Sequence, residues 1–261
     1  MGHTRIGRMG RSKTWREVCA FFDNNAAAGT VAIAVLDAVH KSFNYERLAN
    51  DLMFTEATGL LVQLGIASQS KDFAGHLRNI GLDVSDNPSL PEVKSSIDNY
   101  MDNVCWKSGG QRTDLGEVAK QALLGALQTA VNKHGDQLLW NPSQEDYQTA
   151  FKHLGKAEEF SQLGAYYFGD IMSRSLQVYL SKELPARVGI SDRIRSIHEL
   201  ELFNKELKTH CMETAVVVKD FSTEWLGLHK HKLNDISKKK ISGFATYGLE
   251  KMFKAMKYGK D

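Results

Sequence analysis

The sequence predicts an all-α fold, a globular bundle of about nine to eleven helices. Apolar residues recur at helical spacing along nearly the whole chain, and strand-like alternation is scarce. Only four prolines interrupt 261 residues, and the composition, 42% hydrophobic and 25% charged, is that of an ordinary folded protein. The chain therefore has enough apolar residues to bury a substantial core.

The first predicted element is a short helix that follows a basic, flexible arm over residues 1–12. Its apolar stripe has the spacing i, i+3, i+4, i+7 and consists of Trp15, Val18, Cys19 and Phe22. Residues 26–43 come next and are apolar on all sides, which is typical of a helix inside the core.

Helices are also predicted over residues 45–66 and 70–80, the second of which ends at a glycine C-cap, Gly81. The residues Ser89-Leu90-Pro91-Glu92 match a capping box with proline in the first turn. They predict a helix from this point to about residue 104.

Glycine and polar residues over 107–113 form the best linker in the chain. A boundary there divides the chain into two helical subdomains, residues 13–106 and 114–261. Asp114 with Glu117 caps the next predicted helix, which stops at Gly135.

The C-terminal half is predicted to be helical over most of its length. Ser143 caps a helix that ends near Gly155. Further helices are expected over 156–183, 191–220 and 221–234. Within the first of these, Asp170 and Arg174 stand four residues apart and predict an ion pair. The last helix is amphipathic, with Ser237 or Ser242 as its cap and apolar positions that include Ile241, Phe244, Leu249 and Met252.

Three cysteines, Cys19, Cys105 and Cys211, lie too far apart for a disulfide framework or a zinc site. They predict buried thiols in a reducing, cytoplasmic compartment. The longest uncharged apolar run, residues 26–36, is too short to span a bilayer. No pattern in the sequence indicates a metal ion or a cofactor.

Charge is distributed unevenly along the chain. Residues 1–17 carry five basic residues and one acidic residue, and residues 228–261 carry nine lysines and three acidic residues, so the remainder is net acidic. Either the basic ends dock on the acidic body or they reach an anionic partner. The candidate nucleic-acid or anion-binding residues are Arg5, Arg8, Arg11, Lys230, Lys232, Lys238, Lys239 and Lys240.

One short motif has the form of a catalytic site. Arg193 precedes His198 by five residues inside a predicted helix, and this spacing resembles the Arg-x4-6-His signature of the all-helical HEPN ribonucleases. The resemblance covers six residues and implies that His198 acts as an acid or base while Arg193 steadies a phosphate. Those enzymes usually place a polar residue directly after the arginine, where this chain has Ile194.

Taken with the absence of any other catalytic pattern, these observations predict a non-catalytic interaction subunit. It would bind a protein or nucleic-acid partner through its basic N- and C-terminal segments. Two alternatives remain open: a HEPN-like ribonuclease that uses Arg193 and His198, and a peripheral protein that lies on an anionic membrane surface through its C-terminal basic helix.

Overall fold

The computed structural model describes residues 13–39, 50–110, 112–134, 142–181, 183–191, 193–229 and 236–259. It confirms the all-α class, since these residues form twelve helices and no β-strand. The helices are α1 (Lys13–Asp23), α2 (Ala28–Val39), α4 (Leu52–Ala67), α5 (Phe73–Asn79), α6 (Leu90–Lys107), α7 (Asp114–Lys133), α8 (Gln144–His153), α9 (Ala157–Leu180), α10 (Leu184–Arg187), α11 (Ile197–Thr214), α12 (Val217–His229) and α13 (Lys238–Tyr258).

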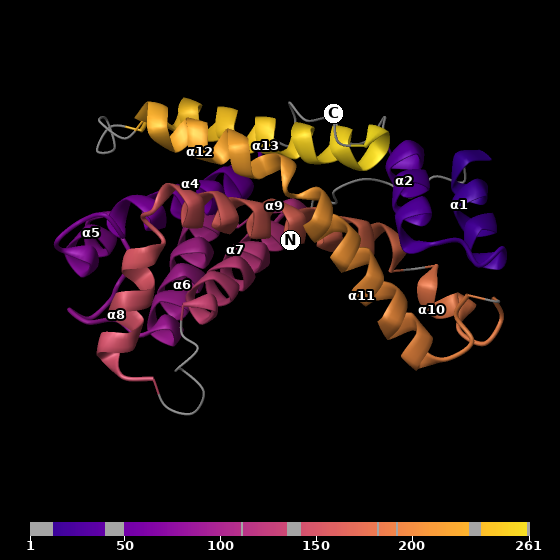
Figure 1. The fold of residues 1–261 in the computed structure, drawn as a ribbon, viewed down its shortest axis with the longest axis horizontal. Helices are drawn as coiled ribbons and strands as arrows, with labels where there is room; N and C mark the ends of the chain where they lie inside the picture. Colours follow the sequence, from indigo (N-terminus) through magenta and orange to yellow (C-terminus); the bar gives the residue numbers. More distant parts are fainter. Residues whose placement is uncertain are drawn as a thin grey trace.

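Helix α9 is the centre of the bundle. It packs against α7, α11, α12, α13 and α2, and Tyr167, Phe168 and Ile171 in its middle are completely buried. Figure 1 shows α12 and α13 side by side along one edge, with α6 and α7 on one flank of α9 and α11 on the other. Because neighbours pack on several sides of α9, most of its residues are buried and the helix has almost no polar face.

Small residues let the neighbours of α9 approach closely. A Cβ atom on Gly164 would lie 2.9 Å from the hydroxyl of Ser222 in α12, and one on Gly248 in α13 would lie 2.3 Å from the ring of Phe168. Since a larger side chain at these positions would push the helices apart, the glycines set the distances between α9 and the α12–α13 layer.

Several helix ends follow the sequence signals. Ser89 and Glu92 form the predicted capping box of α6, and Ser143 caps α8 as expected. Gly81 has a φ of +94°, and the amide of Leu82 donates to the carbonyl of Leu77, which is the predicted glycine-terminated helix end. The cap of α7 differs: Thr113, not Asp114, accepts the amide of Gly116, because its hydroxyl precedes the first turn.

Two predicted helices have different bounds in the structure. The helix predicted from residue 45 begins at Leu52, where Asp51 accepts the amide of Phe54; residues 40–49 lie outside the described ranges. The helix predicted over 191–220 begins only after Ser196, which accepts the amide of Glu199, and the chain turns again after residue 214. Separately, the single turn α10 was not predicted.

Helices on both sides of the 107–113 linker pack together, α6 and α4 against α7, and buried residues of both halves belong to one hydrophobic cluster. Gly109 and Gly110 turn the chain with φ angles of +94° and +71°. The division into two subdomains stays a prediction.

The remaining sequence predictions about buried groups can be compared directly. Cys105 and Cys211 are buried and Cys19 is partly buried, and none of the three forms a disulfide. Asp170 is buried and its carboxylate accepts from Arg174 at 2.6 Å, so the predicted ion pair is confirmed. Among the described helices, none combines the length and the apolar character that crossing a bilayer requires.

Candidate interaction surface

Arg193 and His198 do not share a helix, contrary to the prediction. Arg193 lies in the loop before α11, whereas His198 is exposed in the first turn of that helix. The guanidinium of Arg193 pairs with Glu206 and lies 5.8 Å from the centre of the Phe203 ring. These contacts attach the loop to α11. The ribonuclease reading of the two residues stays a prediction.

Five candidate anion-binding residues, Arg5, Arg8, Arg11, Lys230 and Lys232, lie outside the described residues. The other three, Lys238, Lys239 and Lys240, form the first turn of α13. Lys238 pairs with Glu56 of α4 at 2.7 Å, and Lys257 near the end of α13 pairs with Asp37 of α2 at 2.6 Å. Part of the basic C-terminal segment therefore docks on acidic residues of the body.

The first turn of α13 concentrates positive charge where the helix itself is positive. It contains no acidic residue, and the Ser237 side chain makes no capping hydrogen bond. Because cations near a helix N-terminus are unfavourable by roughly 0.3–1 kcal/mol each, Lys239 and Lys240 do not stabilise α13. Neither lysine forms an ion pair within the described ranges.

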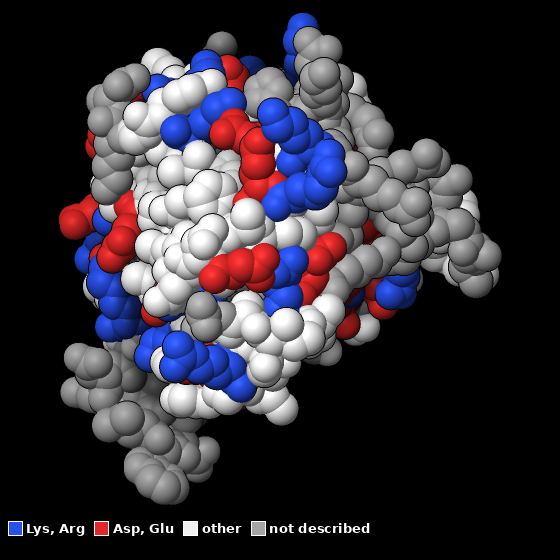
Figure 2. Space-filling model, turned by 90° about the vertical axis from the view of Figure 1, so that its right-hand side faces the viewer, with Lys and Arg blue, Asp and Glu red and all other residues white. Residues whose placement is uncertain are grey.

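Charge on the opposite end of the molecule is mixed. Figure 2 shows basic and acidic side chains next to one another, with uncharged areas between them, on the face that carries α1, α2 and α10. One contact of this kind is the ion pair between Arg187 of α10 and Asp23 of α1. Mixed charge of this kind is typical of an ordinary solvated surface.

A groove lies between α12 and α13. The two helices are antiparallel and adjacent, since Val216 and Val217 before and at the start of α12 line the same groove as Tyr258 and Gly259 at the end of α13. Figure 1 shows the pair along the upper edge of the molecule. The groove has a volume of about 600 Å³, within the usual range of binding sites.

The floor of the groove continues the aromatic core. Phe244 of α13 is buried at 1% exposure and stacks on Phe221 of α12, with ring centres 5.1 Å apart. The ring centre of Tyr247 in turn lies 4.3 Å from that of Phe221, and Tyr247 is 40% exposed. The burial of Phe244 confirms it as an apolar-face residue of α13, and Phe253 is buried as well. The exposed aromatic surface belongs to Tyr247 and Tyr258 instead.

The two rims of the groove carry opposite charge. Asp220 and Glu224, four residues apart on α12, are exposed, and their side chains form no ion pair or hydrogen bond with any described residue. Lys251 and Lys254 stand on the α13 rim. The ammonium of Lys251 lies 5.5 Å above the Tyr247 ring, and Lys254 pairs with Glu250 at 2.6 Å. The groove is thus apolar between one acidic and one basic rim.

Sequence reasoning did not find this groove. Asp220 and Glu224 were not singled out, although their i, i+4 spacing on a predicted helix places them on one face. The pairing of α12 with α13 is a tertiary contact that no local pattern encodes. Among the described residues no group of three histidine, cysteine or acidic side chains is arranged to hold a metal ion.

Comparisons with known proteins place this multi-helix α protein in no family. No family model, curated protein or solved structure matches the chain.

Proposed function

We propose that this protein is an interaction subunit that binds an amphipathic helix of a partner protein in the groove between α12 and α13. The observation that carries the proposal is an apolar groove with exposed Val216, Tyr247 and Tyr258, bounded by oppositely charged rims. Surface helices usually turn such residues inward or cover them, and exposed aromatic rings near charged rims are typical of protein-binding surfaces.

The chemistry of the rims defines the partner. Asp220 and Glu224 attract a row of lysine or arginine residues, while Lys251 and Lys254 attract a row of acidic residues. A helix with an apolar stripe between one basic and one acidic row is complementary to all three parts of the groove. Because the two rims carry opposite charge, the partner helix fits in only one direction along the groove.

Two features favour a protein partner over the other classes. Lys238 and Lys257 of α13 already pair with carboxylates of the body, and the acidic residues of one rim would repel the phosphates of a nucleic acid. The apolar face of α13, including Phe244, Leu249 and Met252, is buried in the core and is not presented to a bilayer.

The test uses three labelled helical peptides that share one apolar stripe. The first has a lysine row on one side of the stripe and a glutamate row on the other; the second has lysine on both sides, and the third has glutamate on both. Fluorescence anisotropy with the full-length protein should show the tightest binding for the mixed peptide. Equal binding of all three, or no binding, would contradict the proposed groove.

Two alanine variants locate the binding site. Tyr258→Ala removes an exposed aromatic side chain of the groove and should weaken binding of the mixed peptide about fivefold, since an interface aromatic contributes on the order of 1 kcal/mol. Trp106→Ala is the matched control, because Trp106 is 79% exposed on α6, outside the groove. An equal loss in both variants would argue against this site.

A nucleic-acid arm completes the test. Labelled single-stranded RNA is titrated across a salt series against the wild type and a variant with Lys239→Glu and Lys240→Glu. These substitutions leave α13 in place, whereas truncation before α13 would expose its buried partners. Salt-sensitive RNA binding that the variant loses, together with no peptide binding, would replace the proposed partner by a nucleic acid.

A further inference from the structure

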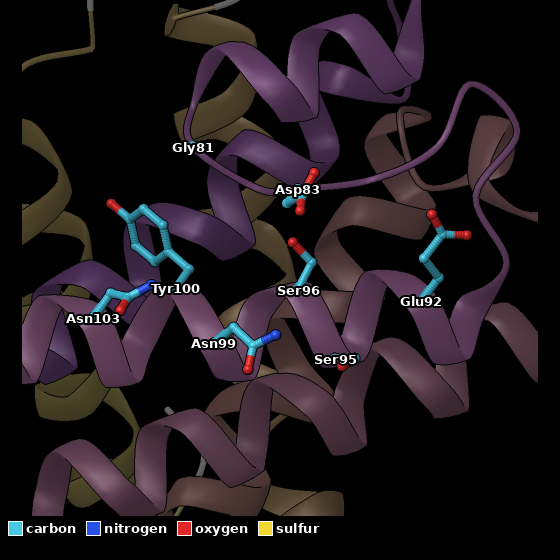
Figure 3. Close-up of a pocket in the computed structure, with 8 residues that line it drawn as sticks. All are labelled: Gly81, Asp83, Glu92, Ser95, Ser96, Asn99, Tyr100 and Asn103. Carbon is cyan, nitrogen blue, oxygen red and sulfur yellow. The ribbon is translucent and has the colours of Figure 1, made fainter.

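A second pocket lies between α6 and the loop that follows α5. Figure 3 shows its lining side chains, and its volume is about 260 Å³. This is slightly below the usual range for drug-sized ligands, about 300–1,000 Å³, and suits a small molecule. The polar side chains used below are Asp83, Glu92, Ser96, Asn99, Tyr100 and Asn103.

The α6 wall is one polar stripe. Glu92, Ser96, Asn99 and Asn103 follow the spacing i, i+4, i+7, i+11, so they share a face of the helix, while the other side of α6 packs into the core. A polar stripe that faces a neighbouring segment of the same chain normally forms hydrogen bonds with it.

Here most of those hydrogen bonds are missing. The side chains of Asp83, Ser96, Asn99 and Asn103 form no hydrogen bond or ion pair with any other described residue. Ser96 is only 5% exposed, and Figure 3 shows its hydroxyl directed from α6 toward Asp83 across the pocket. An unpaired hydroxyl that lines the pocket and faces an unpaired carboxylate leaves hydrogen-bonding capacity for a bound group.

The loop that carries Asp83 is held firmly in place. Leu82 and Val84 on either side are buried, which turns the Asp83 side chain outward over α6. Arg78 donates to the carbonyl of Val84 at 3.1 Å, and the Ser85 hydroxyl donates to Glu92 at 3.1 Å. The backbone that carries Asp83 is therefore held in place before any ligand arrives.

The pocket is anionic. None of its lining residues is basic, and both Asp83 and Glu92 are acidic. Hydrogen bonds, first from the Ser85 backbone, hold the pKa of Glu92 below its usual range, so it remains a carboxylate at neutral pH. Tyr100 closes one end and stays protonated, since burial and then Glu56 raise its pKa to about 12.

We propose that this pocket binds a small organic cation with an ammonium or guanidinium group. The cation would donate to the Asp83 carboxylate and the Ser96 hydroxyl, and the side-chain carbonyl oxygens of Asn99 and Asn103 would accept hydrogen bonds from its remaining N–H groups. The ring of Tyr100 supplies an aromatic neighbour that cations favour. This site is independent of the α12–α13 groove, so either proposal can fail alone.

Solution NMR of the full-length, isotope-labelled protein tests the site. Titration with putrescine or agmatine at constant ionic strength should give saturable shifts of the amides of residues 81–85 and of α6. Butanediol, which lacks the charges of putrescine, should give none. An equal response to butanediol, or no saturable shift with putrescine, agmatine or the arginine derivative described below, would overturn the proposal.

Two charge-neutralising variants on the same loop sharpen the test. Asp83→Asn keeps the shape of the side chain and should weaken amine binding about tenfold or more, because it removes a charged acceptor. Asp86→Asn is the control: Asp86 pairs with Arg78 at 3.1 Å and does not line this pocket. Unchanged affinity in Asp83→Asn, or an equal loss in Asp86→Asn, would overturn the assignment.

One further arm separates two sources of the same chemistry. N-acetylarginine amide represents an arginine side chain of another protein, whereas putrescine and agmatine represent free amines. Tighter binding of a free amine supports a metabolite as the ligand, and tighter binding of the arginine derivative supports a protein side chain. Binding of none of the three overturns the cation site.

Discussion

Replacing Thr58 by valine should destabilise the protein more than replacing its hydrogen-bond partner, Tyr167, by phenylalanine. Both side chains are completely buried at the contact between α4 and α9, and their oxygens lie 2.9 Å apart. Thr58 donates its only hydroxyl hydrogen to the carbonyl of Phe54, so the Tyr167 hydroxyl must donate to Thr58.

The direction of this hydrogen bond makes the two substitutions unequal. Thr58→Val leaves the buried Tyr167 hydroxyl without an acceptor and should cost about 1–3 kcal/mol of unfolding free energy. Tyr167→Phe leaves Thr58 bonded to Phe54 and removes one net hydrogen bond, which is worth about 0.5–1.5 kcal/mol.

Urea unfolding followed by circular dichroism measures both variants and the double variant. The double variant contains no unpaired Tyr167 hydroxyl. It should therefore lose less unfolding free energy than the sum of the losses of the two single variants. If Thr58→Val were no more destabilising than Tyr167→Phe, or if the two losses were additive, the assigned direction of the hydrogen bond would be wrong.

Three shorter predictions concern packing, pH and thiol chemistry. Gly248→Ala should destabilise the protein by about 1–3 kcal/mol, because the new Cβ would lie 2.3 Å from the buried Phe168 ring. Gly243→Ala on the same helix places its Cβ where no atom lies within 4 Å, so it should stabilise the protein through the higher helix propensity of alanine. Urea unfolding compares the two variants. Burial lowers the pKa of His153, so the folded protein binds fewer protons at this residue than the unfolded chain does. The free energy of unfolding should therefore decrease as the pH is lowered from about 7 to about 5, and a His153→Gln variant should show a smaller decrease. Burial raises the pKa of Cys211 to about 12, so iodoacetamide should modify this thiol only after the protein unfolds, as mass spectrometry would show.

Much of the fold was predictable because it is encoded locally. The capping box at Ser89 and the glycine end at Gly81 act through contacts within a few residues, so the sequence contains their whole cause. The amphipathic stripe of α13 likewise identified Phe244 and Leu249 as core positions. Signals of this kind do not depend on what lies elsewhere in the chain.

The sites were not predictable in the same way. The groove requires α12 to lie against α13, and the cation pocket requires Asp83 of a loop to lie over Ser96 of α6. Both depend on tertiary packing. The basic C-terminal segment shows the same limit, since its charge was visible but its pairing of Lys238 with Glu56 was not.

Reversing the charge of the acidic rim tests the proposed groove most directly. A variant with Asp220→Lys and Glu224→Lys makes both rims basic while leaving the apolar floor intact, because both residues are exposed. Anisotropy titrations should then show that the preferred peptide changes from the mixed one to the one with glutamate rows on both sides. An unchanged order of peptide affinities would contradict the proposal that a partner helix binds between α12 and α13.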